Sequence, residues 1–241
     1  MTTGSDRCLS VVMPCFNEAA TVEQVVARVL ESPFVAELIV VDDGSSDGSP
    51  QMVEKNKDPR VRLIAQPTNQ GKGAALRAGF AAATAPFVII QDADMEYDPD
   101  EYGILLGPLL ADQADVVYGS RFLGGRAHRV LYYWHSVGNR LITSVSNMFT
   151  NLNLTDVETC YKAFRRDAIQ SIEIEENRFG VELELTAKAA RKHWRIYEVG
   201  ISYAGRTYAE GKKIGWRDGV WAMITILRYS PLGDRFRTRG T

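Results

Sequence analysis

Four acidic residues stand at alternate positions after an apolar run in the segment FVIIQDADMEYDP, residues 87–99: Asp92, Asp94, Glu96 and Asp98. Two carboxylates at positions i and i+2 past a strand can surround one divalent cation. Alternatively, one binds the cation while the other accepts hydrogen bonds from a sugar or ribose. Oxygen-only ligands suit Mg²⁺ or Mn²⁺, which commonly bridge protein carboxylates and substrate phosphates. A solvated charge run is the alternative, but the position after a strand favours a cation site, and Asp98 is expected to shape or cap the next helix.

These acids belong to a series of apolar runs that alternate with amphipathic stretches. The runs cover residues 9–14, 37–43, 61–66, 87–94 and 115–120, and the amphipathic stretches lie near 19–31, 48–57, 72–84 and 100–113. Runs rich in Val and Ile, separated by helix-length pieces, are typical of a parallel sheet covered on both faces. We therefore predict an open α/β fold, in which the ligand site lies beyond the carboxyl ends of the strands.

Polar or glycine-rich residues also follow each of the other four runs. The segments are PCFNE at 14–18, DDGSSDG at 42–48, NQGKG at 69–73 and GSR at 119–121. Turn composition alone would explain one or two of them, because Gly, Asn, Asp and Ser are what turns need. Together, the five strand ends predict a ligand site along one edge of the sheet.

Two of these loops have alternative interpretations. After the second run, Asp42 and Asp43 are candidates to bind a nucleotide base or ribose, whereas Asp47 and Ser49 are assigned to a turn and a helix cap. After the third run, Lys72 and the N–H groups of a helix start could meet a phosphate. A helix start with a solvated lysine is the other interpretation of that segment.

The second half of the chain is less periodic. Residues 131–152, 181–193 and 216–229 are predicted to form helices, and residues 195–203 a short strand. We find no internal repeat, low-complexity tract or flexible linker, so this half is expected to pack on the first as one unit.

Composition and charge restrict the class of protein. The 241 residues, 45% of them hydrophobic, are enough to bury a sizeable core. A net charge of −2 argues against a nucleic-acid-binding surface. Three cysteines without a CxxC pair indicate neither a disulfide framework nor a zinc site, and they fit a reducing cytoplasm. We expect no exported protein, because the start lacks a signal-peptide pattern, and no run approaches the ~18 apolar residues that span a bilayer.

The motifs VVMPCFNE, IVVDDGSSDGS, NQGKGAALRAGF, QDADMEYDP and GSRF, in this order, resemble the family 2 glycosyltransferases with the GT-A fold. DVETCYKAFRR and residues 178–219 extend the resemblance, which covers about residues 9–230. The combination is similar to the polyprenyl-phosphate glycosyltransferase branch, with its dolichyl-phosphate mannose synthases and bacterial polyprenyl-phosphate glucosyl synthases. It implies inverting transfer of one sugar from a nucleotide diphosphate sugar to polyprenyl phosphate, assisted by Mg²⁺ or Mn²⁺.

The resemblance also implies roles for individual residues. Asp94 and Glu96 would bind the metal ion, and Asp92 would face the ribose or the donor sugar. The residues implied to hold the nucleotide are Pro14, Asn17, Glu18 and Asp42, with Asp43 and Lys72 as further candidates. The residues implied to meet the phosphates of donor and acceptor are Arg121, Arg206 and Lys212.

We expect one GT-A domain with four parts: a flexible N-terminus at 1–8, a nucleotide-sugar-binding half at 9–121, an acceptor-binding half at 122–230 and a basic tail at 231–241. From residue 191 onward, eleven basic residues stand against four acidic ones, a net of +7. Next to these charges, the predicted helix at 216–229 is largely apolar and contains two tryptophans. This pattern suits an anionic membrane surface, and a core helix with a solvated tail is an equal alternative. The expected protein is peripheral on the cytoplasmic face, bound directly or through a small membrane-anchoring subunit.

A lipid phosphate is already an anion, so its transfer needs positioning and charge stabilisation more than a strong base. The sequence offers no obvious Ser-His-Asp or Cys-His set. His128, His135 and His193 are assigned structural or solvated roles, and His135 and Ser136 remain outside candidates for acceptor binding. Similarity to bacterial branch members favours UDP-glucose or a UDP-N-acetylhexosamine over GDP-mannose as donor.

Two other functions remain open. An enzyme of the same fold could use a hydroxyl acceptor on a soluble or cell-wall glycan, with Glu158 as the base that such chemistry needs. A non-catalytic nucleotide-sugar-binding subunit is the second possibility, although the acidic and arginine motifs argue against it.

Overall fold

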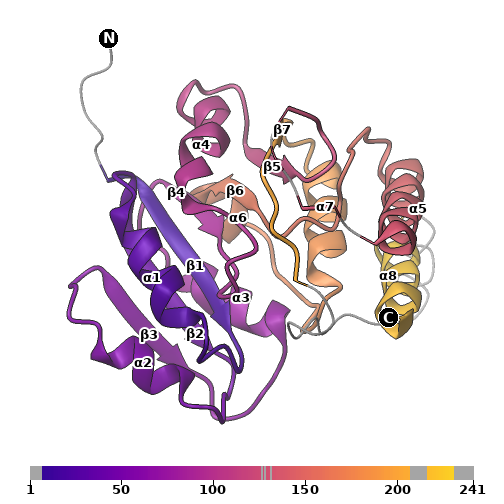
Figure 1. Ribbon diagram of the computed structural model, residues 1–241. Coiled ribbons are helices and arrows are strands. Elements are labelled where there is room, and N and C mark those ends of the chain that lie inside the picture. The colour runs from indigo at the N-terminus through magenta and orange to yellow at the C-terminus, as the bar shows by residue number, and fades with distance from the viewer. Residues whose placement is uncertain (1–6, 126, 128, 131, 207–215, 231–241) are drawn as a thin grey trace, which may run out of the picture.

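The apolar runs form strands of a seven-stranded sheet with helices on both faces (Figure 1). The computed structural model describes residues 7–125, 127, 129–130, 132–206 and 216–230. Its strands are β1 (Leu9–Cys15), β2 (Val35–Asp42), β3 (Val61–Ala65), β4 (Phe87–Ile90), β5 (Val116–Ser120), β6 (Lys162–Arg165) and β7 (Ile196–Gly200). Its helices are α1 (Val22–Glu31), α2 (Ser49–Lys55), α3 (Lys72–Ala82), η1 (Pro99–Glu101), α4 (Tyr102–Leu110), α5 (Tyr133–Thr150), α6 (Arg166–Gln170), α7 (Val181–Arg191) and α8 (Trp216–Tyr229).

The strand order is β3-β2-β1-β4-β6-β5-β7. β6 is antiparallel to its neighbours β4 and β5, whereas every other neighbouring pair is parallel. Because β4 and β5 both run opposite to β6, they run parallel to each other. Six strands therefore end at one edge of the sheet, and β6 begins there. The residues that precede β6 consequently lie at the same edge as those that follow β1, β2, β4 and β5.

The prediction of a mostly parallel α/β sheet is confirmed. The hydrophobic pattern did not indicate β6, because this strand has four residues and begins and ends with charged side chains, Lys162 and Arg165. Its insertion between β4 and β5, together with the pairing of β7 to β5, makes one sheet from both halves of the chain.

Both faces of the sheet are buried, as the apolar runs predict. Val11 and Met13 of β1 pack in the cluster that includes α1 and α4, and Val12 packs in the cluster that includes α3 and α7. Figure 1 shows α1, α2 and α4 on the near face of the sheet. The core thus fixes the strands, and the strand ends fix the loops that follow them.

Two acidic residues of the strand-end motifs have local structural roles, as expected. Asp98 caps η1 by accepting a hydrogen bond from the Asp100 N–H at 3.0 Å, and it pairs with Arg28. Asp47 accepts the N–H of Ser49 at 3.0 Å and the N–H of Ala19 at 2.9 Å, so it joins the loops after β1 and β2.

Helices α5 and α8 pack together at one edge of the molecule (Figure 1). On α8, Ala222 and Ile226 are buried, whereas Val220, Trp221, Ile224 and Leu227 are exposed. The helix therefore packs on the core and also presents an apolar outer face. Within the described ranges, no helix is both long and apolar enough to pass through a bilayer.

Candidate active site

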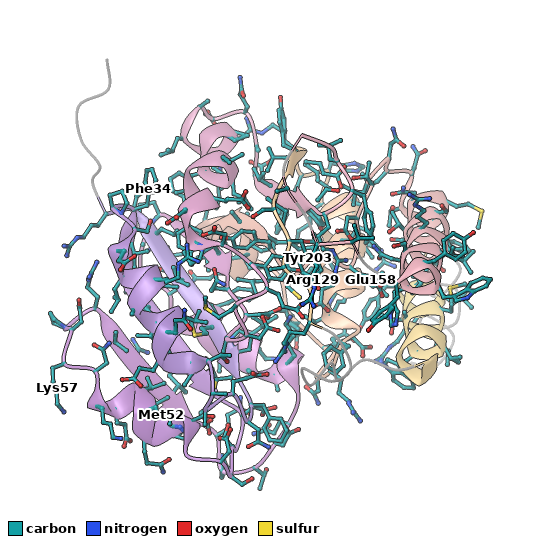
Figure 2. The ribbon with its side chains drawn as sticks, viewed as in Figure 1. Phe34, Met52, Lys57, Arg129, Glu158 and Tyr203 are labelled. Atoms are coloured by element: carbon teal, nitrogen blue, oxygen red, sulfur yellow. The ribbon has the colours of Figure 1, made fainter. Side chains whose placement is uncertain are left out.

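A cavity of about 450 Å³ lies where the strand-end loops converge. The end of β1 and the loops after β1, β2, β3, β4, β5 and β7 line it, together with residues from before β6 and from α3, α7 and α8. Figure 2 labels two of its residues, Glu158 and Tyr203, in the part of the molecule where β5, β7 and α7 lie. The volume is in the range of small-molecule sites.

The loop after β4 turns sharply between two acids. Met95 has a φ of 63°, a left-handed conformation that is uncommon for a residue with a side chain. The turn brings Asp94 and Glu96, on either side of Met95, to the same guanidinium group. Backbone outliers of this kind persist where the surroundings fix them, often at functional sites.

That guanidinium belongs to Arg206. Its Nη2 lies 2.6 Å from Asp94 Oδ2, its Nη1 lies 3.1 Å from Glu18 Oε2, and its Nε lies 3.4 Å from Glu96 Oε1. Its backbone N–H also donates to Glu96 at 2.8 Å, and Tyr203 donates its hydroxyl to the other oxygen of Glu96 at 2.6 Å. One cation is therefore shared by three carboxylates from the loops after β1 and β4.

The local charge perturbs Asp94 strongly. Burial, followed by the neighbouring charges of Asp92 and Glu96, raises the pKa of Asp94 to about 7 despite the contact with Arg206. A cation with more charge than one guanidinium would suit this group of acids.

The donor set fits a divalent cation that binds together with a diphosphate. Asp94 and Glu96 offer carboxylate oxygens, which Mg²⁺ and Mn²⁺ prefer. In the described residues, no three or more His, Cys, Asp or Glu side chains are grouped as a complete metal cage. Mg²⁺ commonly takes one or two protein carboxylates and completes its shell with water and substrate phosphates.

Asp92 contacts a different cation. Lys72 Nζ lies 2.8 Å from Asp92 Oδ1, 3.2 Å from Glu182 Oε1 and 2.7 Å from the Cys160 sulfur. Burial is the largest influence on Asp92 and opposes its ionisation. The charge of Lys72, together with side-chain hydrogen bonds from Cys160 and Lys72, nevertheless gives a net lowering of the pKa of this carboxyl group.

Arg121 also has a carboxylate partner. Its Nε and Nη2 bind the two oxygens of Asp156 at 2.6 and 2.8 Å, a bidentate pair. Asp156 is fully buried and accepts a further hydrogen bond from Asn139 at 3.0 Å. The guanidinium lies over the ring of Tyr203, 5.1 Å from its centroid. Arg121 is thus held with one edge on Asp156 at the cavity wall.

The nucleotide candidates at the ends of β1 and β2 and in the loops that follow divide into two groups. Pro14, Glu18 and Asp43 line the cavity. Asn17 and Asp42 instead accept N–H groups of the 42–48 loop, from Ser46 and Ser45 respectively. Oδ1 of Asp42 is buried and has no hydrogen-bond partner in the described structure, so a ligand N–H or O–H could satisfy it.

The comparison with protein families decides the class. A family model described as glycosyl transferase family 2 matches residues 10–173. The chain belongs to glycosyl transferase family 2. The resemblance in the sequence motifs is thereby confirmed.

Two curated proteins match this glycosyltransferase along most of their length. An undecaprenyl-phosphate mannosyltransferase of Micrococcus luteus is 28% identical over 235 residues, covering 92% of this chain and 93% of the relative. A polyprenol monophosphomannose synthase of Mycolicibacterium smegmatis is 28% identical over 239 residues, covering 95% and 89%.

A solved structure confirms the GT-A fold. Glucosyl-3-phosphoglycerate synthase from Mycobacterium tuberculosis, in complex with Mn²⁺ and UDP-glucose, matches with a TM-score of 0.75. The match covers 94% of this glycosyltransferase and 80% of that chain at 22% sequence identity.

The cavity of this glycosyltransferase has a surplus of negative charge. Among its described residues, seven carboxylates face four basic side chains: Glu18, Asp43, Asp92, Asp94, Glu96, Glu158 and Glu182 against Lys72, Arg121, Arg178 and Arg206. A diphosphate would enter an already negative site. An added divalent cation would offset this repulsion.

Several candidates of the glycosyltransferase lie elsewhere. Lys212 and His128 lie outside the described residues, as does the basic tail at 231–241. His135, Ser136 and His193 are described but are not among the residues that line the cavity.

Sequence reasoning missed several residues of the cavity and its walls. Asp156, Cys160 and Glu182 bind the cations of the site, and Tyr203 contacts both Arg121 and Glu96. Asp156 and Cys160 stand in the same polar segment as Glu158, directly before β6. Had β6 been recognised as a strand of the sheet, the polar residues before it could have been placed at the ligand edge.

Proposed function

We propose that this glycosyltransferase moves one sugar from a nucleotide diphosphate sugar to the phosphate of a polyprenyl lipid, with inversion at the sugar carbon. The observation that supports this most directly is the composition of one cavity. It brings the acidic loop with Asp92, Asp94 and Glu96 together with two arginines, Arg121 and Arg206. The names of two relatives, which cover almost the whole chain, point to the same class of acceptor.

The residues have distinct tasks in this reaction. Asp94 and Glu96 would hold a divalent cation, which stabilises the charge of the leaving diphosphate when it is bound. Asp92 would accept hydrogen bonds from the ribose or sugar, and Arg121 would position the acceptor phosphate. Because that phosphate is already ionised, in-line positioning replaces proton removal as the main requirement.

The donor is open to a direct test. The sequence resemblance favours UDP-glucose or a UDP-N-acetylhexosamine, but both relatives are named for mannose. A thermal-shift screen of UDP-sugars and GDP-mannose, with and without Mn²⁺, would identify the donor, because a ligand of the native state raises its stability. Purified protein with Mg²⁺ or Mn²⁺, polyprenyl phosphate and each donor should then form a glycolipid. If none forms with any common nucleotide sugar, the proposed function fails.

Peripheral binding to the cytoplasmic face of a membrane would bring the enzyme to its acceptor. Trp134, Leu141 and Met148 recur at seven-residue spacing on α5 and are 78%, 58% and 70% exposed. They form an apolar stripe on a helix that packs against α8, which also has an apolar outer face. A small membrane-anchoring subunit could cover the same surface.

Charges placed on these helices should weaken membrane binding. We expect the double variant Trp134→Glu/Ile224→Glu to bind vesicles that contain phosphatidylglycerol about tenfold less tightly, because apolar and aromatic side chains lose their place at the interface. Sedimentation with vesicles measures this. Leu110→Glu is the control, since Leu110 is exposed on α4, on the other face of the sheet. Equal vesicle binding by wild type and the double variant would remove these helices from the membrane contact.

A hydroxyl acceptor is the second candidate function. Glu158 lines the cavity, and burial raises its pKa to about 7. A carboxylate with a pKa near neutrality can act as a general base for a hydroxyl group. Competition between polyprenyl phosphate and a glycan acceptor would separate the two functions.

The raised pKa of Glu158 predicts a pH-dependent stability. Its pKa in the fold lies above the unfolded value of 4.5, so its ionised form destabilises the fold, and stability falls as the pH rises from about 4.5 through about 7. We expect Glu158→Gln to increase the free energy of unfolding by on the order of 1–3 kcal/mol at pH 8 and by much less at pH 4.5. Urea unfolding at both pH values tests this. A gain of the same size at both would contradict it.

A further inference from the structure

Most of the backbone N–H groups at the NQGKG loop and the start of α3 donate hydrogen bonds within the protein. The N–H groups of Gln70 and Gly71 donate to the two oxygens of Asp43 at 2.8 and 2.7 Å. The N–H groups of Gly73 and Ala74, in the first turn of α3, donate to the carbonyl of Asn177 at 2.8 and 3.3 Å. A phosphate at this helix start would have to displace these partners.

The two glycines of this loop serve a close approach of backbones. A Cβ atom on Gly71 would collide with the Asn177 carbonyl, and a Cβ on Gly73 would collide with the Glu176 carbonyl. Gly71 also has a φ of 103°, which side chains disfavour. The glycines therefore let the start of α3 dock on residues 176–177, which lead into α7.

The ammonium of Lys72, between these glycines, is fully engaged. A lysine has three N–H donors, and Lys72 has three protein acceptors, on Asp92, Glu182 and Cys160. Its side chain lines the cavity but is only 12% exposed, and these protein acceptors surround its ammonium group. The Cys160 thiol in turn faces Glu182, with 3.7 Å between sulfur and Oε1.

We propose that Lys72 is a positioning residue for Asp92 and does not bind a phosphate. Glu182 of α7 and Cys160 before β6 hold the ammonium, and the ammonium fixes Asp92 toward the ribose or sugar hydroxyl groups of the donor. The inference rests on the proposed function, because it assumes a nucleotide sugar in the cavity. It also gives the second half of the chain a task in donor binding, since Cys160 and Glu182 lie beyond residue 121.

Nucleotide binding separates this role from phosphate binding. Wild type and Lys72→Met are titrated calorimetrically with UDP and UMP, and in parallel with GDP and GMP. For each protein, the titrations give the ratio of the dissociation constant of the monophosphate to that of the diphosphate. A positioning residue leaves that ratio within twofold of wild type, because it touches neither phosphate. If Lys72 contacted a phosphate group instead, Lys72→Met would weaken binding of the diphosphate at least tenfold more than binding of the monophosphate. That result would overturn the proposal. Arg77→Met, a cation of the same helix outside the cavity lining, is the control.

A double-mutant cycle tests the coupling to Asp92. We expect Lys72→Met and Asp92→Asn each to lower kcat/KM about a hundredfold, since misplacement of a positioning group costs on the order of 10²-fold. The double variant should be no worse than the poorer single variant, within threefold. Losses that multiply would show that Lys72 acts independently of Asp92.

The cycle is repeated in the Glu182→Gln background. Lys72→Met leaves the carboxylates of Asp92 and Glu182 without their cation, which could destabilise the fold. Glu182→Gln removes one of these two charges, so that the coupling between Lys72 and Asp92 can be measured without such a folding defect. Circular dichroism confirms the fold of each variant. The two levels of failure are distinct: absence of any nucleotide binding by wild type would refute the proposed function, whereas multiplicative losses or a changed binding ratio would refute only the role of Lys72.

Discussion

Asp94→Ala should abolish sugar transfer, with a loss of kcat on the order of 10³-fold or more. Asp94 is one of the two proposed metal ligands. Its Oδ2 lies 2.6 Å from Nη2 of Arg206. On the proposed function, removing it would take away both a ligand for the divalent cation and the charge that holds a guanidinium in the phosphate site, where stabilisation of developing charge is worth several kcal/mol. Initial rates with radiolabelled donor and polyprenyl phosphate measure the loss.

Two further variants make this result specific to the metal site. Asp100→Ala removes an exposed acid six residues away that pairs only with Arg28 among the described residues, and it should keep wild-type activity. Asp94→Asn keeps the shape of the side chain and should still lose most activity, because the negative charge is needed. Substantial turnover by Asp94→Ala, at any Mg²⁺ or Mn²⁺ concentration, would exclude Asp94 as a metal ligand.

Arg206→Met should have two opposite effects. Transfer should fall by at least a hundredfold, and more than nucleotide affinity falls, because the guanidinium would stabilise phosphate charge in the transition state. The affinity of the nucleotide-free protein for Mn²⁺ should rise at least tenfold, about 1.4 kcal/mol. The reason is that Arg206 contacts Asp94, Glu96 and Glu18, and so competes for the carboxylates proposed to bind the cation.

Mn²⁺ titration followed by calorimetry or electron paramagnetic resonance measures the second effect. Arg195→Met is the matched control, since Arg195 also pairs with two carboxylates, Asp112 and Asp115, but does not line the cavity. A Mn²⁺ affinity that stays the same or falls in Arg206→Met would show that the guanidinium and the cation do not share ligands. Unchanged transfer would remove Arg206 from the active site.

Much of the first half could be predicted because its signals are local. β4 covers Phe87–Ile90, the four apolar residues before the acidic loop, and β1, β2, β3 and β5 agree with the predicted runs to within about two residues. Asp98 could be assigned to a cap because capping depends on neighbours in the sequence. The same local reasoning was insufficient for Lys72, because its three partners come from Asp92, Cys160 and Glu182, far apart in the chain.

Local patterns in the sequence specify most of the strands and helices, although not β6, and they show that acidic and glycine-rich loops follow the strand ends, since hydrophobic periodicity and turn chemistry act over a few residues. Which charges pair depends on how the strands assemble in three dimensions. Asp156 and Cys160 reach Arg121 and Lys72 because β6 enters the sheet antiparallel, so that its first residues lie at the edge where the other strands end. Strand order and direction depend on packing between distant segments, and the partners of each cation in the cavity follow from them.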